Sequence, residues 1–449
     1  MMTQLLRQLL LCMFYAAVLG MAPEAKALGL LQAYDAALAN DPAYRAAVQD
    51  NAAGQQFKVL GRAYLLPLVS ASYSTNKNQA DITTTSLGIG RAEHRNYTGL
   101  AASVQLRQPL FYPEGHARFN QGVAQTNASD AQFSVRSQDL IARLVTLYAN
   151  TKFAEDQLEQ AVAQREAYAE LRLANKRMFL KGEGTRTDVL ETQAKFNAAI
   201  AHVFDARDNL DNAREALAAM IGQDIAALDA LSEDFKITAM QPASFDEWKN
   251  IALANNPEIA AQRYAIDIAE QEILKNAAGH LPRLDLIASL SKSSSDTINT
   301  FNQNANTRSI GVQLNVPLYA GGSVSAATTQ AAANHEKAKA DLDGKTSQVL
   351  VELRKQYNFA LSSNARIEAT ASALRSATLL VDATVKSVKG GQRTNLDVLN
   401  AQQQLFEAKR DLGQARYNYL LSFFRLRYSA GTLSLADLAE MAAYFVAGN

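Results

Sequence analysis

The feature that most constrains this chain of 449 residues is an internal duplication. Several short motifs of the first half recur in the same order in the second half, among them Asn40-Asp41-Pro42 as Asn255-Asn256-Pro257 and Ile221-Gly222 as Ala430-Gly431. The displacement is 215 residues for the first motif and 209 for the second, and self-similarity at a nearly constant spacing indicates two copies of one structural unit. We therefore predict two structural repeats, at residues 28–241 and 242–449, each with a helix, a strand hairpin and a pair of long helices.

The N-terminal segment, residues 1–27, is set apart from the repeats because it has the pattern of a secretory signal peptide. Arg7 precedes an apolar run at residues 9–19 that is too short to span a bilayer, and Ala25-Lys26-Ala27 is typical of a cleavage site. The single cysteine, Cys12, lies in this segment. The mature chain is therefore expected to contain neither a disulfide nor a thiolate metal cluster.

Each repeat contains two stretches in which apolar and polar residues alternate, as in half-buried strands. These four strands are predicted at residues 68–74, 100–106, 284–290 and 310–316. The connecting segments, 75–96 and 291–308, are rich in Asn, Thr, Ser and Asp, and we expect them to be solvent-exposed loops.

The number of predicted strands limits how this chain can enter a membrane. After the signal segment no run of about 18 apolar residues occurs, so insertion would require a closed barrel. A membrane barrel usually needs about eight strands or more, which one chain does not supply. Three chains would supply twelve. An ordinary soluble antiparallel sheet is the alternative interpretation.

Long helices are indicated by apolar and small residues that repeat at alternating steps of three and four. The clearest such seam covers residues 350–388, and matching seams cover 189–217 and 398–426. A helix over residues 326–388 would be roughly 90 Å long at about 1.5 Å per residue, which is too long for a globular core. Glycine-rich turns at 181–187 and 389–395, with Thr or Asn to cap the next helix, predict two helical hairpins.

The charge balance and the histidines argue against several classes of function. Lys plus Arg equals Asp plus Glu at 44 each, so the chain has no net basic character that would favour nucleic acid. The five histidines are scattered without metal-ligand spacing, and no nucleophile or phosphate-binding motif follows a predicted strand. We therefore predict no catalytic residue, metal or cofactor. A periplasmic structural coiled-coil protein remains an alternative, although it does not explain the paired strands.

The motifs of the second half resemble a known family. Residues 279–286, 393–399, 415–420 and 431–433 are similar to signature stretches of the TolC family of outer-membrane efflux proteins, and the resemblance spans the mature chain. It implies a mixed α and β homotrimer, in which a twelve-stranded outer-membrane β-barrel with four strands per chain continues into a long periplasmic α-helical coiled-coil barrel. It also implies an equatorial belt formed by residues 30–39, 246–253 and 433–444.

The resemblance implies a function in export across the outer membrane of a Gram-negative bacterium. Its expected partners are outer-membrane lipid, a periplasmic adaptor and an inner-membrane ABC transporter or other pump, and no nucleic acid. We expect an exit duct that passes unfolded proteins in type I secretion. The alternative within the family is the outer-membrane component of a multidrug or small-molecule efflux pump.

The resemblance also implies roles for residues at the hairpin turns. The positions that match adaptor-docking tips are Gly182, Gly184, Thr185, Gly390 and Gly391. The positions that match the links closing the periplasmic gate are Arg393, Thr187 and Asp188, and Asp397 matches a ring of charge at the entrance. Two positions depart from the family pattern, because Asn400 replaces a second carboxylate and Val388 replaces a tyrosine. These departures predict a less acidic mouth with fewer closing links.

Overall fold

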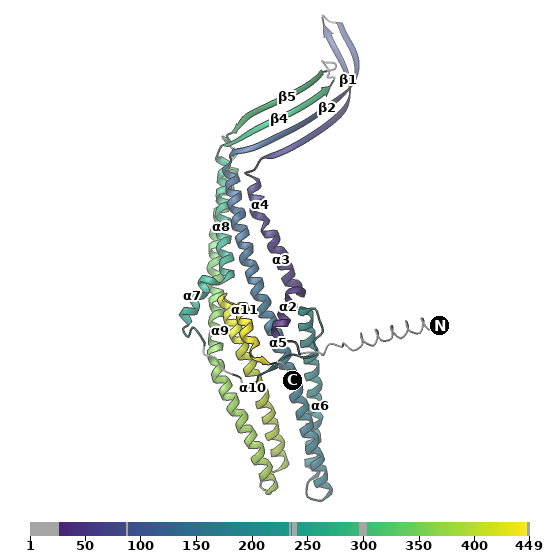
Figure 1. Ribbon diagram of the computed structural model, residues 1–449, viewed down its shortest axis with the longest axis vertical. Helices are drawn as coiled ribbons and strands as arrows, with labels where there is room; N and C mark the ends of the chain where they lie inside the picture. Colours follow the sequence, from purple (N-terminus) through teal and green to yellow (C-terminus); the bar gives the residue numbers. More distant parts are fainter. Residues whose placement is uncertain (1–26, 87–88, 233–234, 236–239, 296–302, 447–449) are drawn as a thin grey trace, which may run out of the picture. The chain divides into compact units, whose positions relative to one another are not determined.

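The computed structural model describes residues 27–86, 89–232, 235, 240–295 and 303–446 (Figure 1). The expected signal peptide lies outside these residues except for Ala27. The chain divides into two compact units. We call residues 48–133 and 257–347 the sheet unit, and residues up to 47, 134–256 and 348–449 the helical unit. Each unit takes parts from both predicted repeats, whose boundary at residues 241 and 242 stays a prediction.

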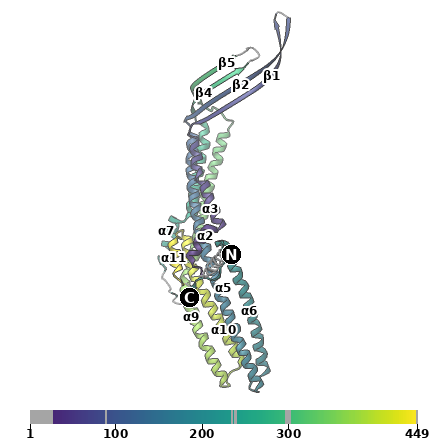
Figure 2. The same cartoon turned by 45° about the vertical axis from the view of Figure 1, so that its right-hand side comes forward.

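The sheet unit contains one antiparallel sheet of four strands in the order β1-β2-β4-β5. Its strands are β1 (Leu68–Ser86), β2 (Ile89–Phe111), β4 (Arg283–Ser295) and β5 (Gln303–Asn315). The helices α4 (Gln56–Ala63) and α8 (Pro257–Ala277), with the short 3-10 helix η1 (Ala278–His280), lead into the two strand hairpins. Both views show β1 and β2 extending beyond β4 and β5 (Figure 2).

The register of the sheet gives it one apolar and one polar face, as the alternation predicts. Val104 of β2 pairs with Ala71 of β1 and with Leu290 of β4, and these three side chains share a face because paired residues of antiparallel strands point the same way. On the other face hydroxyl groups meet across the strands. The Oγ atoms of Ser72 and Ser103 lie 2.8 Å apart.

The loops expected at residues 75–96 and 291–308 are largely strand, so that prediction was wrong. The ladder continues to Ser86 and resumes at Ile89 in the first hairpin, and in the second it continues to Ser295 and resumes at Gln303. Backbone hydrogen bonds hold an antiparallel ladder whatever side chains it carries. Polar residues on both faces indicate contact with water and do not indicate a loop.

The helical unit is built from two hairpins of long helices. The first joins α5 (Pro113–Leu180) to α6 (Arg186–Ile221), and the second joins α9 (Ser323–Lys389) to α10 (Asn395–Ala430). The extent of α9 agrees closely with the predicted helix over residues 326–388. In the seams of α6 and α10 every predicted member is buried or half-buried, whereas Asn364 and Thr378 in the seam of α9 are exposed in one chain. Among the described residues no helix is both long and apolar enough to cross a bilayer.

Three short helices pack on the long ones at the segments where the resemblance implies a belt. They are α2 (Leu30–Asn40), α7 (Phe245–Asn255) and α11 (Leu435–Ala442). Leu30 of α2 and Leu438 of α11 share a core with Leu144 of α5, and all three are buried. On α7, Trp248 is buried in a second cluster with Leu353 of α9. Two short strands, β3 (Ala230–Leu231) and β6 (Phe445–Val446), pair beside the first core.

The repeated motif at Asn40 and Asn255 has a structural role that the repeat leads one to expect. Pro42 begins α3 (Pro42–Gly54) and Pro257 begins α8, where a missing N–H costs nothing. The Nδ2 of Asn40 donates to the carbonyl oxygen of Ile221 at 2.8 Å, and the Nδ2 of Asn256 donates to that of Ser429 at 3.0 Å. In each half the motif therefore ties the chain to the C-terminal end of α6 or α10.

Candidate functional site

The two hairpin tips have the same backbone geometry. The glycines Gly182 and Gly391 adopt left-handed conformations with φ of 81° and 73°. After α5 the amide of Glu183 donates to the carbonyl oxygen of Met178 at 2.9 Å, and after α9 the amide of Gln392 donates to that of Ser387 at 2.9 Å. This pattern ends a helix at a residue with a left-handed backbone conformation, which only glycine adopts without strain. The predicted turns at both tips are confirmed.

The tip glycines differ in the space around them. A Cβ added at Gly182 or Gly391 would have no atom within 4 Å, but the positive φ would strain it. A Cβ at Gly184 would lie 3.3 Å from the Cβ of Met178 and the backbone nitrogen of Phe179. A Cβ at Gly390 would come no closer than 3.6 Å to any atom, which is ordinary contact. Gly390 is therefore the tip position where a larger side chain fits the local backbone.

Two carboxylates near the tips, those of Asp188 and Asp397, cap the helices that follow. The Asp188 carboxylate accepts from the backbone amide of Thr185 at 2.9 Å, and the Thr185 hydroxyl accepts from the amide of Asp188 at 3.1 Å. Asp397 and Thr394 form the same reciprocal capping box at the start of α10. Each carboxylate is thus fixed at a helix N-terminus, where the helix dipole favours negative charge.

Hydrogen bonds and charge lower the pKa values of both carboxyls. Burial works against ionisation of Asp188, but hydrogen bonds from Thr185 and from the Asn395 side chain outweigh it and hold the pKa of Asp188 below its ordinary value. The backbone and hydroxyl of Thr394 do the same for Asp397, and the positive charge of Arg393 adds to the lowering of its pKa. Both groups are therefore anionic near neutral pH.

Within one chain the gate residues are only partly brought together. Asn395 connects the α10 tip to Asp188, and further along the hairpins the Nζ of Lys195 donates to the Oε1 of Gln403 at 2.5 Å. In the described part of a single chain, no hydrogen bond or ion pair joins Arg393 to Thr187 or Asp188. Arg393 is exposed, and its positive charge lowers the pKa of Asp397 in its own turn. A link from Arg393 to Thr187 and Asp188 therefore stays a prediction.

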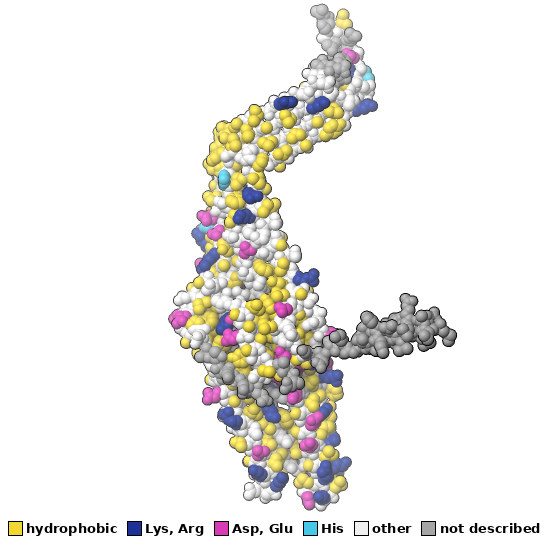
Figure 3. All heavy atoms as spheres, viewed as in Figure 1, with side chains coloured by type: hydrophobic (Ala, Val, Ile, Leu, Met, Phe, Trp, Pro, Cys, Tyr) yellow, Lys and Arg dark blue, Asp and Glu magenta, His cyan; other side chains and the backbone are white. Residues whose placement is uncertain are grey.

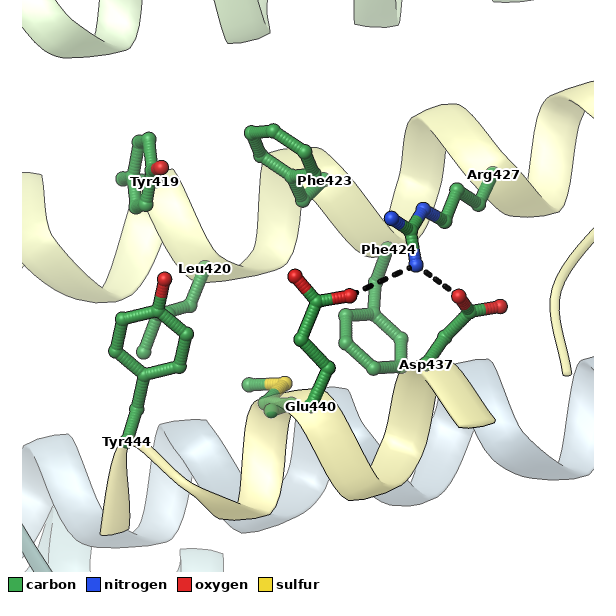
Figure 4. A pocket seen from close by; sticks show the side chains of 9 residues that line it. Tyr419, Leu420, Phe423, Phe424, Arg427, Asp437, Glu440 and Tyr444 are labelled. Atoms are coloured by element: carbon green, nitrogen blue, oxygen red, sulfur yellow. Dashed lines mark hydrogen bonds and ion pairs between the residues drawn. The ribbon is translucent and has the colours of Figure 1, made fainter. Parts of the chain in front are cut away.

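The expected belt contains a small pocket between α10 and α11 (Figure 4). Tyr419 and Phe423 of α10 line it on one side, and Tyr444 lines it beyond the end of α11. The Arg427 guanidinium points across the gap between the helices, where it pairs with the carboxylates of Asp437 and Glu440. This ion pair holds α11 against α10, and the sequence analysis did not identify it.

A second cluster that sequence reasoning missed lies on the polar face of the sheet. The Asp285 carboxylate is 2% exposed and accepts from the Nη2 of Arg107 at 2.5 Å and from the Nε of Arg283 at 3.0 Å. Arg107 is on β2 and the other two are on β4, so the cluster joins the first strand hairpin to the second. The sequence did not indicate this cluster, because the register between β2 and β4 cannot be read from either hairpin alone.

The described residues contain no candidate metal centre. Among them, no group of three or more His, Cys, Asp or Glu side chains is placed to hold a metal ion. What they offer is an amphipathic sheet with two open edges, two long helical hairpins and a set of charged groups at the hairpin tips.

Comparison with known proteins agrees with this arrangement. The sequence profile of the outer membrane efflux protein family matches residues 33–223 and 248–432. The alkaline protease secretion protein AprF of Pseudomonas aeruginosa is 44% identical over 99% of this chain and 92% of its own length. The outer membrane protein TolC of Escherichia coli is 30% identical over 94% of this chain and 86% of its own length.

A solved structure shows the same fold at lower sequence identity. The channel protein CusC superimposes with a TM-score of 0.78 at 18% identity, over 90% of this chain and 92% of its own. The expected fold class, mixed α and β with four strands per chain joined to long helices, is therefore confirmed. This chain belongs to the outer membrane efflux protein family, the TolC family that its motifs resemble, and it is an outer-membrane protein of a Gram-negative bacterium with a large periplasmic helical part.

Proposed function

We propose that this protein is the outer-membrane exit duct of a type I secretion system, through which unfolded proteins pass from an ABC transporter and its adaptor to the outside. The observation that carries the proposal is the similarity to AprF, which is named for secretion of alkaline protease and matches along nearly the whole of both chains. Because the match includes the helices as well as the strands, the likeness concerns the complete duct.

The sheet supports a duct made of three chains. Among the described strands of a single chain, β1 and β5 each present one edge without a partner. Unpaired backbone groups are very unfavourable in lipid, so membrane-spanning sheets close on themselves. Pairing β1 of one chain with β5 of the next would close three sheets into a barrel of twelve strands. The apolar face would then contact lipid, and the polar face with Arg107, Arg283 and Asp285 would line the lumen.

The hairpin tips support a periplasmic entrance that can be closed. In a trimer Arg393 of one chain would lie near Thr187 and Asp188 of another and link the hairpins, and three copies of Asp397 would place negative charge around the opening. The adaptor could approach the backbone of the tips closely, because the tip residues are small. These residues are Gly182, Gly184, Thr185, Gly390 and Gly391. Links of this kind are individually weak, which lets adaptor binding shift a closed population to an open one.

Export of a protein cargo tests the proposal. The gene would be expressed in a host that lacks its own exit duct, together with an ABC transporter and adaptor from the same genome, and extracellular cargo would be measured. We expect cargo in the medium only when all three proteins are present. The similarity to TolC and the family description favour a second candidate, the duct of a small-molecule efflux pump. Restored drug resistance without cargo export would support that candidate and contradict ours.

A further inference from the structure

Three basic side chains lie on the apolar face of the sheet: Lys77, which is further along β1 toward its turn, and Lys292 and Arg308, which lie next to apolar residues. Arg308 of β5 pairs with Leu290 of β4, which pairs with Val104 of β2, so all three share one face. Lys292, two residues after Leu290 on β4, pairs with Ala102 of β2 and therefore lies on the same face. A charged side chain facing lipid is most unfavourable at the membrane centre and is tolerated near the interface. The level of these residues along the strands therefore matters.

Lys292 and Arg308 lie where the apolar band ends, on the side away from the helices. On β5 the band includes Leu314, Val312 and Ile310, which are 62%, 61% and 77% exposed, and Arg308 is the next residue on that face. Figure 3 shows basic side chains at the edge of the apolar area of the sheet, toward the strand turns. Tyr73 of β1 pairs with Ala102 and so shares its level with Lys292. Aromatic residues at this level are typical of a membrane interface.

Lys292 and Arg308 line the same hollow in the face of the sheet. It has a volume of about 540 Å³, and its lining includes Lys292, Arg308, Leu290 and the small residues Ala71 and Ala102. Val104 and the polar residues Ser72, Ser103, Ser291, Asn306 and Thr307 complete the lining, so the hollow combines two cations with a partly apolar surface. Such a surface is complementary to a molecule that has an anionic head and a hydrocarbon body.

Neighbouring acidic groups do not neutralise this pair in the part of the chain that the structure describes. Lys292 and Arg308 are exposed, and no ion pair to either is found among the described residues. The carboxylate that the described strands place on this face is Asp81, which lies further along β1 beside His94. The net charge at the rim of the hollow is therefore positive.

We propose that Lys292 and Arg308 form a binding site for the phosphorylated headgroup of a lipid in the outer leaflet, with its acyl chains on the hollow. The inference rests on the proposed membrane orientation, in which the helices are periplasmic and the strand turns face outward. A guanidinium offers paired donors to phosphate oxygens, and an ammonium adds a second charge on the same group. Three such sites would surround one trimer and fix its depth in the membrane.

Lipid titration by native mass spectrometry tests the site on the intact trimer in detergent. The probe is diphosphoryl lipid A, with the same lipid lacking both phosphates as its control. We expect the parent to prefer the phosphorylated lipid. Each basic residue should contribute on the order of fivefold, so the double variant Lys292→Gln/Arg308→Gln should bind roughly 25-fold more weakly. The variant Arg308→Lys should keep most of the affinity because it keeps the charge.

Matched controls separate a specific site from general attraction. Lys337→Gln removes the same charge from an exposed position on α9, where Lys337 pairs with Asp341, and should leave lipid binding unchanged. Millimolar inorganic phosphate should displace little lipid, because it lacks the acyl chains that occupy the hollow. Equal affinity of the parent and the double variant, equal binding of the lipid without phosphates, or full displacement by inorganic phosphate would each overturn the proposal. Cargo export by the double variant in cells that carry the transporter and adaptor would leave the proposed function standing whatever the lipid titration shows.

Discussion

At the scale of single residues, the carboxylates of Asp188 and Asp397 combine a capping role with a negative charge at the hairpin tips. Asp397 completes a capping box with Thr394, and it carries a negative charge at the expected entrance. Asp188 completes the equivalent box on α6, yet the family resemblance gives it a different role. Capping of the following helix explains why a carboxylate is present at both positions. An experiment on the role of its charge therefore needs a control that changes the cap alone.

The charge of Asp397 is expected to make the channel prefer cations, because a narrow mouth focuses the field of three like charges. Asp397→Asn should therefore reduce cation preference, measured as the reversal potential across a planar bilayer under a salt gradient. Thr394→Ala is the matched control, since it removes the same capping box but leaves the charge. If Thr394→Ala shifts the reversal potential as much as Asp397→Asn does, the effect comes from the cap.

Arg393 is expected to help hold the periplasmic end closed. Arg393→Ser should raise single-channel conductance several-fold without any partner protein, and Asp188→Ala should raise it in part. Exposed charge pairs are screened by salt, so high salt should reproduce some of the increase. Arg186→Ser is the control, because it removes an exposed arginine from the other tip. Parent-like conductance of Arg393→Ser at low and high salt would rule out the closing role.

The ion pair between Asp41 and Arg143 offers a stability test with a defined pH dependence. Burial opposes ionisation of Asp41, but hydrogen bonds from the Arg143 guanidinium and the Tyr44 amide outweigh it and hold the pKa of Asp41 below its ordinary value. A group with a lowered folded-state pKa stabilises the fold above its unfolded pKa of about 4, and this stabilisation is lost as the pH falls through the folded pKa.

The substitution Asp41→Asn should lower the free energy of unfolding by roughly 1 kcal/mol at neutral pH, since water partly screens the half-exposed Arg143. Asparagine occupies the equivalent position of the second half, Asn256, so the change should be compatible with the local backbone. Thermal unfolding in detergent at neutral and acidic pH would measure the difference between parent and variant. A difference that does not shrink in acid would show that the ion pair is not its source.

At the scale of elements, the helices and turns could be predicted from sequence more completely than the strands could. Heptad spacing and a glycine followed by a threonine are signals carried by residues close together in the sequence. They therefore predicted the limits of α9 and of both tips. The strand ends were not, because the polar residues after Thr75 and Ser291 belong to a ladder held by its backbone. The Asp285 cluster and the Arg427 ion pair depend on which elements pack together, and sequence spacing does not contain that information.

The hairpin tips are expected to bind the adaptor, and Gly390 offers the cleanest test. Gly390→Ala should leave export nearly unchanged, whereas Gly390→Leu should abolish it by preventing close approach. Neither change strains the local backbone, because a Cβ at this position meets no atom closer than 3.6 Å. Substitutions at Gly391 would confuse docking with the strain of its positive φ. Normal export by a trimeric Gly390→Leu protein would move the docking site elsewhere.

At the scale of the whole molecule, one chain leaves surfaces exposed that a soluble monomer would normally cover. Its sheet has two open edges and an apolar face on which Leu314 and Val312 are more than half exposed. The duplication explains how a single chain supplies two strand hairpins and two helical hairpins of similar design. The proposed closing of the sheet, entrance ring and gate links would each involve neighbouring copies of the chain.

Three chains are expected to complete one channel, and the mass of the purified particle tests this. The mature protein would be purified in mild detergent, and its mass would be measured by light scattering with the detergent contribution subtracted. We predict three chains per particle, because three sheets of four strands make the closed barrel of twelve strands that the family resemblance implies. A folded, monodisperse particle of one or two chains would contradict this prediction.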